Sequence, residues 1–379
     1  MTRYLLTLSW LLLSACGGGG DSSDTNVDQP PPVEETGPCS QTTQGQVNWA
    51  ALMEAECRQL AQYGLFQDPQ DPTSSPNAPG QAYDLSTQLF TDHAVKFRFL
   101  FLPEGQAMQF QPEEVLSLPV GSILVKSFTL PADTDLGEGG ELTLVETRLL
   151  IHRQSGWTAL VYRWQQGEAT LLDTGASVPH TLIHQGESIN FNYSIPSRVE
   201  CKICHQRRQE DGTSPIWPIG LQPHLLQLPG NNQLVRWQQQ GQLDGLPQDA
   251  LPWAPPLTDE QGDLTARVKG YLDVNCAHCH NPRGHASLSG LRLGFYEDHT
   301  QSSYGICKQP PGWDGGPRGL DYDIVPGNGQ DSILPYRMEL QQPKDRMPML
   351  GRNLVHREAV DLVRQWIDAL PPSLGECQN

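Results

Sequence analysis

The sequence predicts an α+β protein with several domains, in which an antiparallel all-β domain precedes a mainly α part. Residues 82–195 are rich in β-branched and aromatic side chains, and apolar residues recur at every second position in the run at 95–101. From residue 196 onward that period is lost, and several segments have helical spacing. The 36 glycines and 32 prolines predict many turns and irregular segments between these elements.

The clearest predicted strand covers residues 95–101, where Phe97, Phe99 and Phe101 alternate with charged or aliphatic side chains. This period of two is typical of a strand with two different faces. Glycine, proline and aspartate separate the runs that follow, so we expect antiparallel strands in a sandwich or a partial barrel. Further strands are predicted at 122–130, 141–152, 157–164, 169–173 and 188–193.

Helical spacing first occurs before these strands, at residues 47–65, and a segment rich in proline, aspartate and serine follows it. The strongest helix is predicted at 358–370, where Val360, Val363 and Ile367 share one face and two prolines end the pattern. Further helices are predicted at 233–240, 263–275 and 332–340.

The N-terminus has the features of an export signal. Arg3 precedes a short apolar run at 5–13, which is too short to span a bilayer and is typical of a signal peptide. Leu13–Ser14–Ala15–Cys16 resembles a bacterial lipobox, which predicts that Cys16 is acylated and becomes the new N-terminus. The alternative is ordinary cleavage with Cys16 incidental. Gly17 follows instead of aspartate, which favours the periplasmic side of the outer membrane over the inner membrane.

The formal net charge is −18, from 43 acidic and 25 basic residues. Such an acidic chain is a poor match for nucleic acid or for an anionic membrane surface, because like charges repel. A basic or neutral partner protein suits it better. The alternative interpretation is that the charge serves solubility alone.

The nine cysteines divide into three groups. Cys16 is the predicted lipid site, and four others lie in two short repeats. The remaining Cys39, Cys57, Cys307 and Cys377 are expected to form disulfides in an oxidising compartment, with free thiols as the alternative. Four cysteines allow three pairings. We favour Cys39–Cys57, which closes a short loop, and Cys307–Cys377, which ties the C-terminal tail to the preceding segment.

The pattern Cys-x-x-Cys-His occurs twice, at 201–205 and at 276–280. Covalent haem attachment needs two thiols spaced to reach two vinyl groups, followed by an imidazole that binds the iron, and this pattern provides all three. The sequence therefore predicts two covalently bound haem c groups. The residues that would hold them are Cys201, Cys204 and His205 at the first site and Cys276, Cys279 and His280 at the second.

Zinc binding and dithiol redox chemistry are the rival interpretations. Neither explains why a histidine directly follows each second cysteine. A bare pair of cysteines would also tend to oxidise in an exported protein. The residues that could be drawn as a zinc site are Cys276, His278, Cys279, His280 and His285, with Cys201, Cys204 and His205 as part of another.

The second site has a candidate sixth ligand in Met347, which precedes Pro348. Together with the helix at 358–370, it resembles the distal methionine loop and C-terminal helix of class I cytochromes c. A thioether ligand favours Fe(II) and raises the reduction potential. The helix at 263–275 runs into Cys276, as the N-terminal helix of that class does. Met349 is the alternative ligand, and without haem both methionines would be core filler.

The first site has no Met–Pro pair before the second motif begins. His224, nineteen positions after His205, is the candidate sixth ligand by residue type and distance. The alternatives are that His224 is an ordinary surface-loop histidine, and that the first iron is five-coordinate or takes a ligand from further along the chain. An open iron would change an electron carrier into a catalyst.

These residues together resemble a family of exported dihaem c-type cytochromes of Gram-negative bacteria, which couple a β-rich N-terminal region to two Cys-x-x-Cys-His motifs. The resemblance spans most of residues 47–370, and implies the cofactor and compartment more than the reaction. Glu146 and Arg148 are better explained as an ion pair of the β domain than as catalytic groups. The matching residues are Tyr63–Gly64–Leu65–Phe66, 89–94 with Lys96, 119–121 with Val125 and Lys126, Glu146–Thr147–Arg148, 201–205, 275–281, 325–327 with Ser332, and the loop around Met347.

We therefore expect a membrane-tethered periplasmic electron carrier that meets an unidentified redox partner protein and no nucleic acid. The alternatives are a dihaem peroxidase-like enzyme or a dehydrogenase's cytochrome subunit, and a non-redox surface protein that binds partners through its β domain. The predicted divisions are 1–16 for the lipoprotein signal peptide and lipidated cysteine, 17–38 for a flexible linker, 39–80 for a helical lead-in, 81–195 for the β-rich domain, 196–257 for the first haem-binding segment and 258–379 for a class I cytochrome c-like haem domain.

Overall fold

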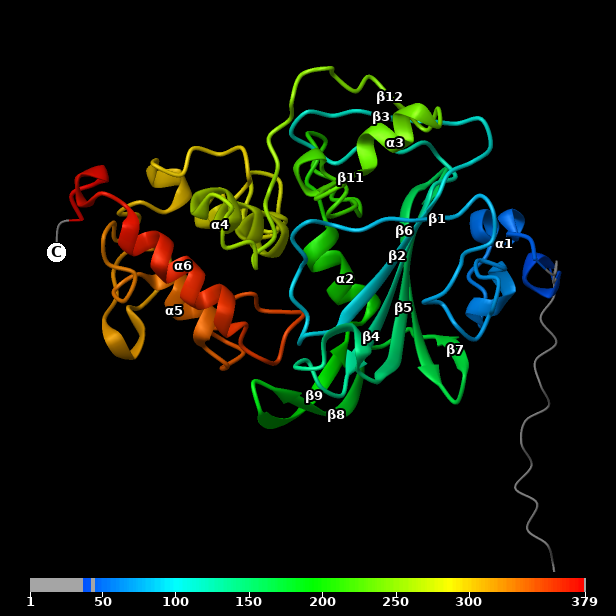
Figure 1. The fold of residues 1–379 in the computed structure, drawn as a ribbon, viewed down its shortest axis with the longest axis horizontal. Helices are drawn as coiled ribbons and strands as arrows, with labels where there is room; N and C mark the ends of the chain where they lie inside the picture. The colour runs from blue at the N-terminus through cyan, green and yellow to red at the C-terminus, as the bar shows by residue number, and fades with distance from the viewer. Residues whose placement is uncertain (1–36, 42–44, 378–379) are drawn as a thin grey trace, which may run out of the picture. The chain divides into compact units, whose positions relative to one another are not determined.

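A six-stranded antiparallel sheet organises the protein. The computed structural model describes residues 37–41 and 45–377. The sheet confirms the antiparallel β region predicted within 81–195, and every strand predicted there lies within about two residues of an observed strand. In sheet order the strands are β1 (Gln81–Ala82), β2 (Val95–Phe101), β4 (Ile123–Pro131), β5 (Leu142–Arg153), β6 (Gly156–Gln165) and β7 (Glu168–Leu171) (Figure 1).

The two faces of the sheet have different chemistry because side chains alternate along each strand. On the first face, Phe99 and Phe101 of β2 join Val125 of β4 in an apolar cluster with the N-terminal lead-in. On the second face, Lys96 and Arg98 of β2 are buried although both are basic. Because chain packs on both faces, the sheet forms neither the sandwich nor the partial barrel that we expected.

The lead-in covers the first face with helix α1 (Trp49–Glu54) and the 3₁₀ turn η2 (Leu60–Tyr63). The single helix expected over 47–65 is wrong. The chain becomes extended at Ala55, and two tyrosines then bind the backbone of Cys57. The Cys57 N–H donates to Tyr63 Oη (2.9 Å), and Tyr162 Oη of β6 donates to the Cys57 carbonyl (2.7 Å). These bonds replace the helical ones that the spacing suggested.

Both predicted disulfides are confirmed. Cys39 pairs with Cys57 across 18 residues, and Cys307 pairs with Cys377 across 70 residues. The first pair lies inside the apolar cluster between the lead-in and the sheet. The second ties the end of the described chain to the segment that precedes helix α5 (Ile333–Glu339).

We expect removal of the Cys307–Cys377 disulfide to destabilise the protein more than removal of the Cys39–Cys57 disulfide. Closing a longer loop removes more entropy from the unfolded chain, which predicts losses of roughly 4 and roughly 3 kcal/mol respectively. Guanidinium unfolding of the two paired Cys→Ser variants measures both losses. An unchanged unfolding midpoint in the Cys307/Cys377 variant would contradict the expectation.

A two-stranded hairpin of β8 (Ala176–His184) and β9 (Glu187–Ile195) follows the sheet. Strand β9 contains the strand expected at 188–193, whereas β8 was not predicted. Most of β8 is exposed or half-buried, and Leu182 is its one fully buried side chain. A strand with so little buried apolar surface leaves only a weak period in the sequence.

The helices of the C-terminal part agree with the four predicted after residue 196. Helices α4 and α6 contact each other, and α5 packs on α6 (Figure 1). They share an apolar cluster that includes Leu272, Val363 and Trp366. The helices are α2 (Arg198–His205), α3 (Gln233–Gln239), α4 (Leu264–Leu272) with its π-helical continuation η5 (Asp273–Ala277), α5, and α6 (Arg357–Ala369).

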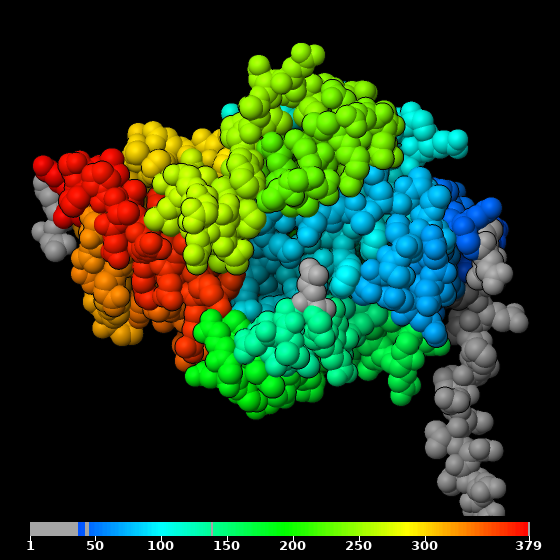
Figure 2. Space-filling model, viewed as in Figure 1, coloured from blue at the N-terminus to red at the C-terminus, as the bar shows by residue number. Residues whose placement is uncertain are grey.

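The segment 196–257 interlocks with the β-rich region. Strand β3 (Met108–Gln109) pairs in parallel with β12 (Leu243–Asp244), and Trp237 of α3 is buried in one apolar cluster with Leu100 of β2. The described residues thus belong to one compact unit, whose surface is shown in Figure 2. The other short elements are β10 (Gln227–Leu228), β11 (Asn231–Asn232), η1 (Gly37–Ser40), η3 (Gly137–Gly139), η4 (Pro223–Leu225), η6 (Ser287–Ser289), η7 (Ser302–Tyr304), η8 (Gly316–Arg318) and η9 (Pro372–Leu374).

Several predictions concern the N-terminal residues. The signal peptide and lipidated Cys16 predicted at 1–16 lie outside the described residues, as does the predicted linker apart from its last two residues. Among the helices of the described chain, none combines the length and the apolar character needed to cross a bilayer.

Candidate functional site

The first Cys-x-x-Cys-His motif lies on helix α2. Ser197 begins this helix: its hydroxyl accepts a hydrogen bond from Glu200 N (3.3 Å), and the Glu200 carboxylate accepts one from Ser197 N (2.8 Å). The sequence predicted no helix here, but the first turn of α2 precedes Cys201. Helical spacing of three and four residues places Cys201, Cys204 and His205 on the same side of α2.

The second motif follows helix α4 without a break, as predicted. The helix widens into the π turn η5, and the next turn is closed by hydrogen bonds from Cys279 N (3.1 Å) and His280 N (2.9 Å) to the Cys276 carbonyl. Both motifs therefore end a helix, which groups the two thiols and the imidazole within about one turn of chain.

Both motif histidines are held by their Nδ1 atoms. His205 Nδ1 lies 2.8 Å from the Trp217 carbonyl oxygen, so it must donate. His280 Nδ1 lies 3.0 Å from Ser289 Oγ, whose own hydrogen goes to the Ala286 carbonyl. Burial lowers the pKa of each histidine to about 4, so both rings are neutral at neutral pH. In this tautomer Nε2 carries a lone pair, the form that binds a metal.

A cavity of about 490 Å³, called here the first cavity, lies between α2 and the second face of the sheet. Its volume lies in the usual range for cofactor and ligand sites. The loop of residues 346–352 closes part of it. The lining that matters for its chemistry comprises Cys201, Cys204 and His205 from α2 and Lys96, Lys126 and Arg148 from the sheet.

A smaller second cavity, of about 80 Å³, lies between the second motif and the loop that carries Met347. Cys276, Cys279 and His280 line one part of it, and Met347 and Met349 line another. The structure thus brings the predicted methionine loop to the predicted histidine. Met347 is half-buried, whereas Met349 is 44% exposed. A macrocycle fits here only if the methionine loop moves away from the motif.

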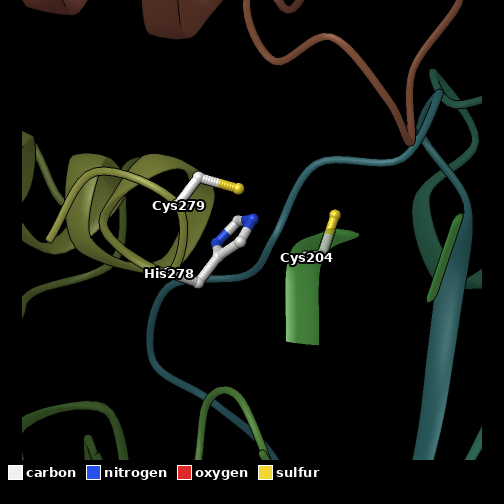
Figure 3. A group of neighbouring side chains, drawn as sticks. All are labelled: Cys204, His278 and Cys279. Carbon is white, nitrogen blue, oxygen red and sulfur yellow. The ribbon is translucent and has the colours of Figure 1, made fainter. Parts of the chain in front are cut away.

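The two motifs meet. Ligand atoms of Cys204, His278 and Cys279 all lie within 4.8 Å of one another, and Figure 3 shows the imidazole of His278 and the sulfur of Cys279 turned toward Cys204. Hydrogen bonding from Cys279, and then from His278, lowers the pKa of the Cys204 thiol. His278 lines both cavities, so it stands where the two sites join.

This meeting point is the arrangement in the structure that most resembles a zinc site. A structural zinc ion takes four protein ligands. Within the described part of the chain, the group contains only Cys204, His278 and Cys279. Cys276, the other thiol of the second motif, is not a member of this group. The residues that the sequence suggested as zinc ligands therefore do not come together as a site. Of those in and after the second motif, only His278 and Cys279 lie near Cys204.

His224 does not lie at the first motif, which corrects the prediction made for its side chain. It is fully buried, its Nε2 lies 3.1 Å from Asp273 Oδ2, and its ring stacks on Phe295 with the ring centroids 4.4 Å apart. It lines neither cavity. The surface-loop alternative is equally wrong. His224 instead packs the segment 196–257 against the turn that leads into the second motif.

The second face of the sheet contributes residues that the sequence did not assign to a site. Glu146 accepts hydrogen bonds from Arg148 Nε (2.8 Å) and Tyr193 Oη (2.7 Å), which confirms the expected ion pair and places it beside the first cavity. Lys96 and Lys126 line the same cavity. The signal was present in the sequence, because each lysine interrupts a strand whose other side chains are mostly apolar.

No family model, curated protein or solved structure matches this chain. The fit to haem therefore depends on the residues themselves. Each motif presents two thiols and a neutral imidazole whose Nδ1 is engaged, and each lines a cavity. The first cavity has the room for a macrocycle, and the second has the more complete pair of candidate axial ligands. The donor set fits covalent haem better than it fits zinc.

Proposed function

We propose that this chain is a dihaem c-type cytochrome that transfers electrons. Cys201 and Cys204 would hold one haem with His205 as axial ligand, and the second motif would hold the other in the same way. Haem, when bound, supplies a one-electron Fe(III)/Fe(II) couple. The hydrogen bonds at Nδ1 of His205 and His280 would leave each Nε2 available to bind iron.

The observation that carries this proposal is the meeting of the two motifs. The sulfurs of Cys204 and Cys279 belong to different motifs but lie within 4.8 Å of each other. Cys204 and Cys279 would each hold one of the two haems, so the residues that bind the two groups are neighbours. Such proximity suits electron passage between them and needs no substrate pocket.

We also propose that the C-terminal part is a class I cytochrome c-like haem domain. Helices α4 and α6 pack together, and the loop with Met347 lies against the second motif, an arrangement that resembles a class I cytochrome c. We further propose that a lipid on Cys16 anchors the protein at the periplasmic side of the outer membrane. The net charge of −18 suits a basic or neutral redox partner.

The alternative function is a dihaem peroxidase-like enzyme. The first cavity favours it, because lysine side chains that can exchange protons line it together with His205. An enzyme of this kind would need an open iron and an acid–base group near it. Lys96, which is buried, and Lys126, which is half-buried, line the cavity and are the candidates for that role.

A redox titration followed by peroxide addition separates the two functions. A carrier is expected to show two one-electron steps per chain and to remain low-spin at both irons. It should not consume hydrogen peroxide at a catalytic rate. Turnover of peroxide together with a high-spin haem would favour the enzyme instead.

A further inference from the structure

A row of three basic side chains crosses the second face of the sheet. Arg98 of β2 lies opposite Lys126 of β4, which lies opposite Arg148 of β5. Like charges directly opposite each other on neighbouring strands are destabilising. Asp84 compensates Arg98 (2.6 Å), and Glu146 compensates Arg148.

Lys126, the middle residue of the row, has no acidic partner of this kind. Within residues 37–41 and 45–377, Lys126 makes no side-chain hydrogen bond or ion pair with the protein. Its side chain lines the first cavity together with Cys201, Cys204 and His205. An amine therefore faces the same cavity as the histidine of the first motif, with no partner of its own.

The environment favours the neutral form of this amine. Burial is the main cause, and the neighbouring charges of Arg98 and Arg148 add to it, so that the pKa of Lys126 falls to about 7. A neutral amine has a lone pair that can bind a metal, whereas an ammonium ion has none.

We propose that Lys126 Nζ would bind the iron of a haem held at the first motif, as a second protein ligand in addition to His205. The inference rests on the proposed dihaem function. Coordination would release one proton from the ammonium form to solvent and donate the nitrogen lone pair to iron, and no other bond forms or breaks. Filling both axial positions would make the first haem an electron carrier and leave no open iron for peroxide.

Lys96 provides a matched control. It lines the same cavity and is more deeply buried than the half-buried Lys126, but its Nζ donates to the Ala94 carbonyl (3.0 Å) and lies 5.7 Å from the centre of the Phe128 ring. His278 provides a second control, because it lines the first cavity as a histidine but is an intervening residue of the second motif, not that motif's iron-binding histidine. Neither is expected to bind the first iron.

The test compares the wild-type chain with Lys126→Ala, Lys96→Ala and His278→Ala, each exported and purified in the ferric state. Electron paramagnetic resonance reports spin state, and near-infrared magnetic circular dichroism distinguishes amine, imidazole and thioether ligands. We expect one histidine–amine haem in wild type, and its conversion to high-spin haem in Lys126→Ala alone. Intact mass counts the haems in every sample.

Three results would overturn the inference. A high-spin haem in the wild-type protein would show that the first iron has an open position. Two low-spin haems without an amine signature would show that a residue other than lysine binds the first iron. Retention of the wild-type spectrum in Lys126→Ala excludes Lys126 directly. Because the first two results come from wild type, they decide the question even where a variant fails to fold. Protein with no haem by mass would instead overturn the proposed function itself.

Discussion

Replacing Cys276 and Cys279 with serine is expected to halve the haem content of the exported protein and to abolish its higher-potential redox step. Each haem is held by the two thioethers of its own motif, so loss of both thiols at one site removes one group and leaves the other. The second site also contains the candidate thioether ligand, which raises a potential. Intact mass and a redox titration measure both effects.

Two matched variants define the specificity of this result. Serine at Cys201 and Cys204 should remove the other haem and the lower-potential step. Serine at Cys39 and Cys57 should leave both haems in place, because that disulfide lies on the opposite face of the sheet. Two haems per chain in the Cys276/Cys279 variant would contradict covalent attachment at the second motif.

Replacing Met347 with leucine is expected to lower the potential of the second haem by on the order of 0.1 V, a part of the ~0.8 V range that axial ligands set. Leucine keeps the bulk of the side chain but cannot bind iron, so the second haem should also become high-spin. Met347 is half-buried at the second cavity and lines it together with His280. Potentiometry followed by optical spectroscopy measures both changes.

Met349→Leu is the control for this prediction. Met349 lines the same cavity but is 44% exposed, so its loss should leave the potential and the spin state unchanged. A shift of the potential in Met349→Leu with no shift in Met347→Leu would show that Met349 is the iron ligand and Met347 is not. No shift in either variant would exclude the methionine loop as a source of the ligand.

The sequence predicted the parts of the fold in which the local pattern of apolar residues agrees with the tertiary packing. Strand β2 alternates because its two faces contact different surroundings, and α6 is amphipathic because one face packs on α4. The break after α1 was not predictable from spacing, because it depends on Tyr63 and on Tyr162, which lies about a hundred residues further along the chain. Strand β8 was missed because it buries little apolar surface.

The candidate site likewise has residues that the sequence predicted and contacts that it did not. Local motifs identified the cysteines and histidines of both triplets and the methionine loop. The ligand environment of the first motif depends on contacts between distant segments, and sequence distance from His205 pointed wrongly to His224. Lys126 lies about eighty residues before His205, and only the packing of α2 on the sheet brings them to one cavity. The meeting of Cys204 with Cys279 likewise follows from tertiary structure alone.

The central claim is that both motifs hold covalent haem, and intact-mass spectrometry of the protein exported from a host with a cytochrome c assembly system tests it most directly. The account predicts the mass of the chain plus two haem groups, and a reduced-minus-oxidised spectrum typical of c-type haem. A chain without added haem, particularly one that binds zinc through Cys204, His278 and Cys279, would contradict it.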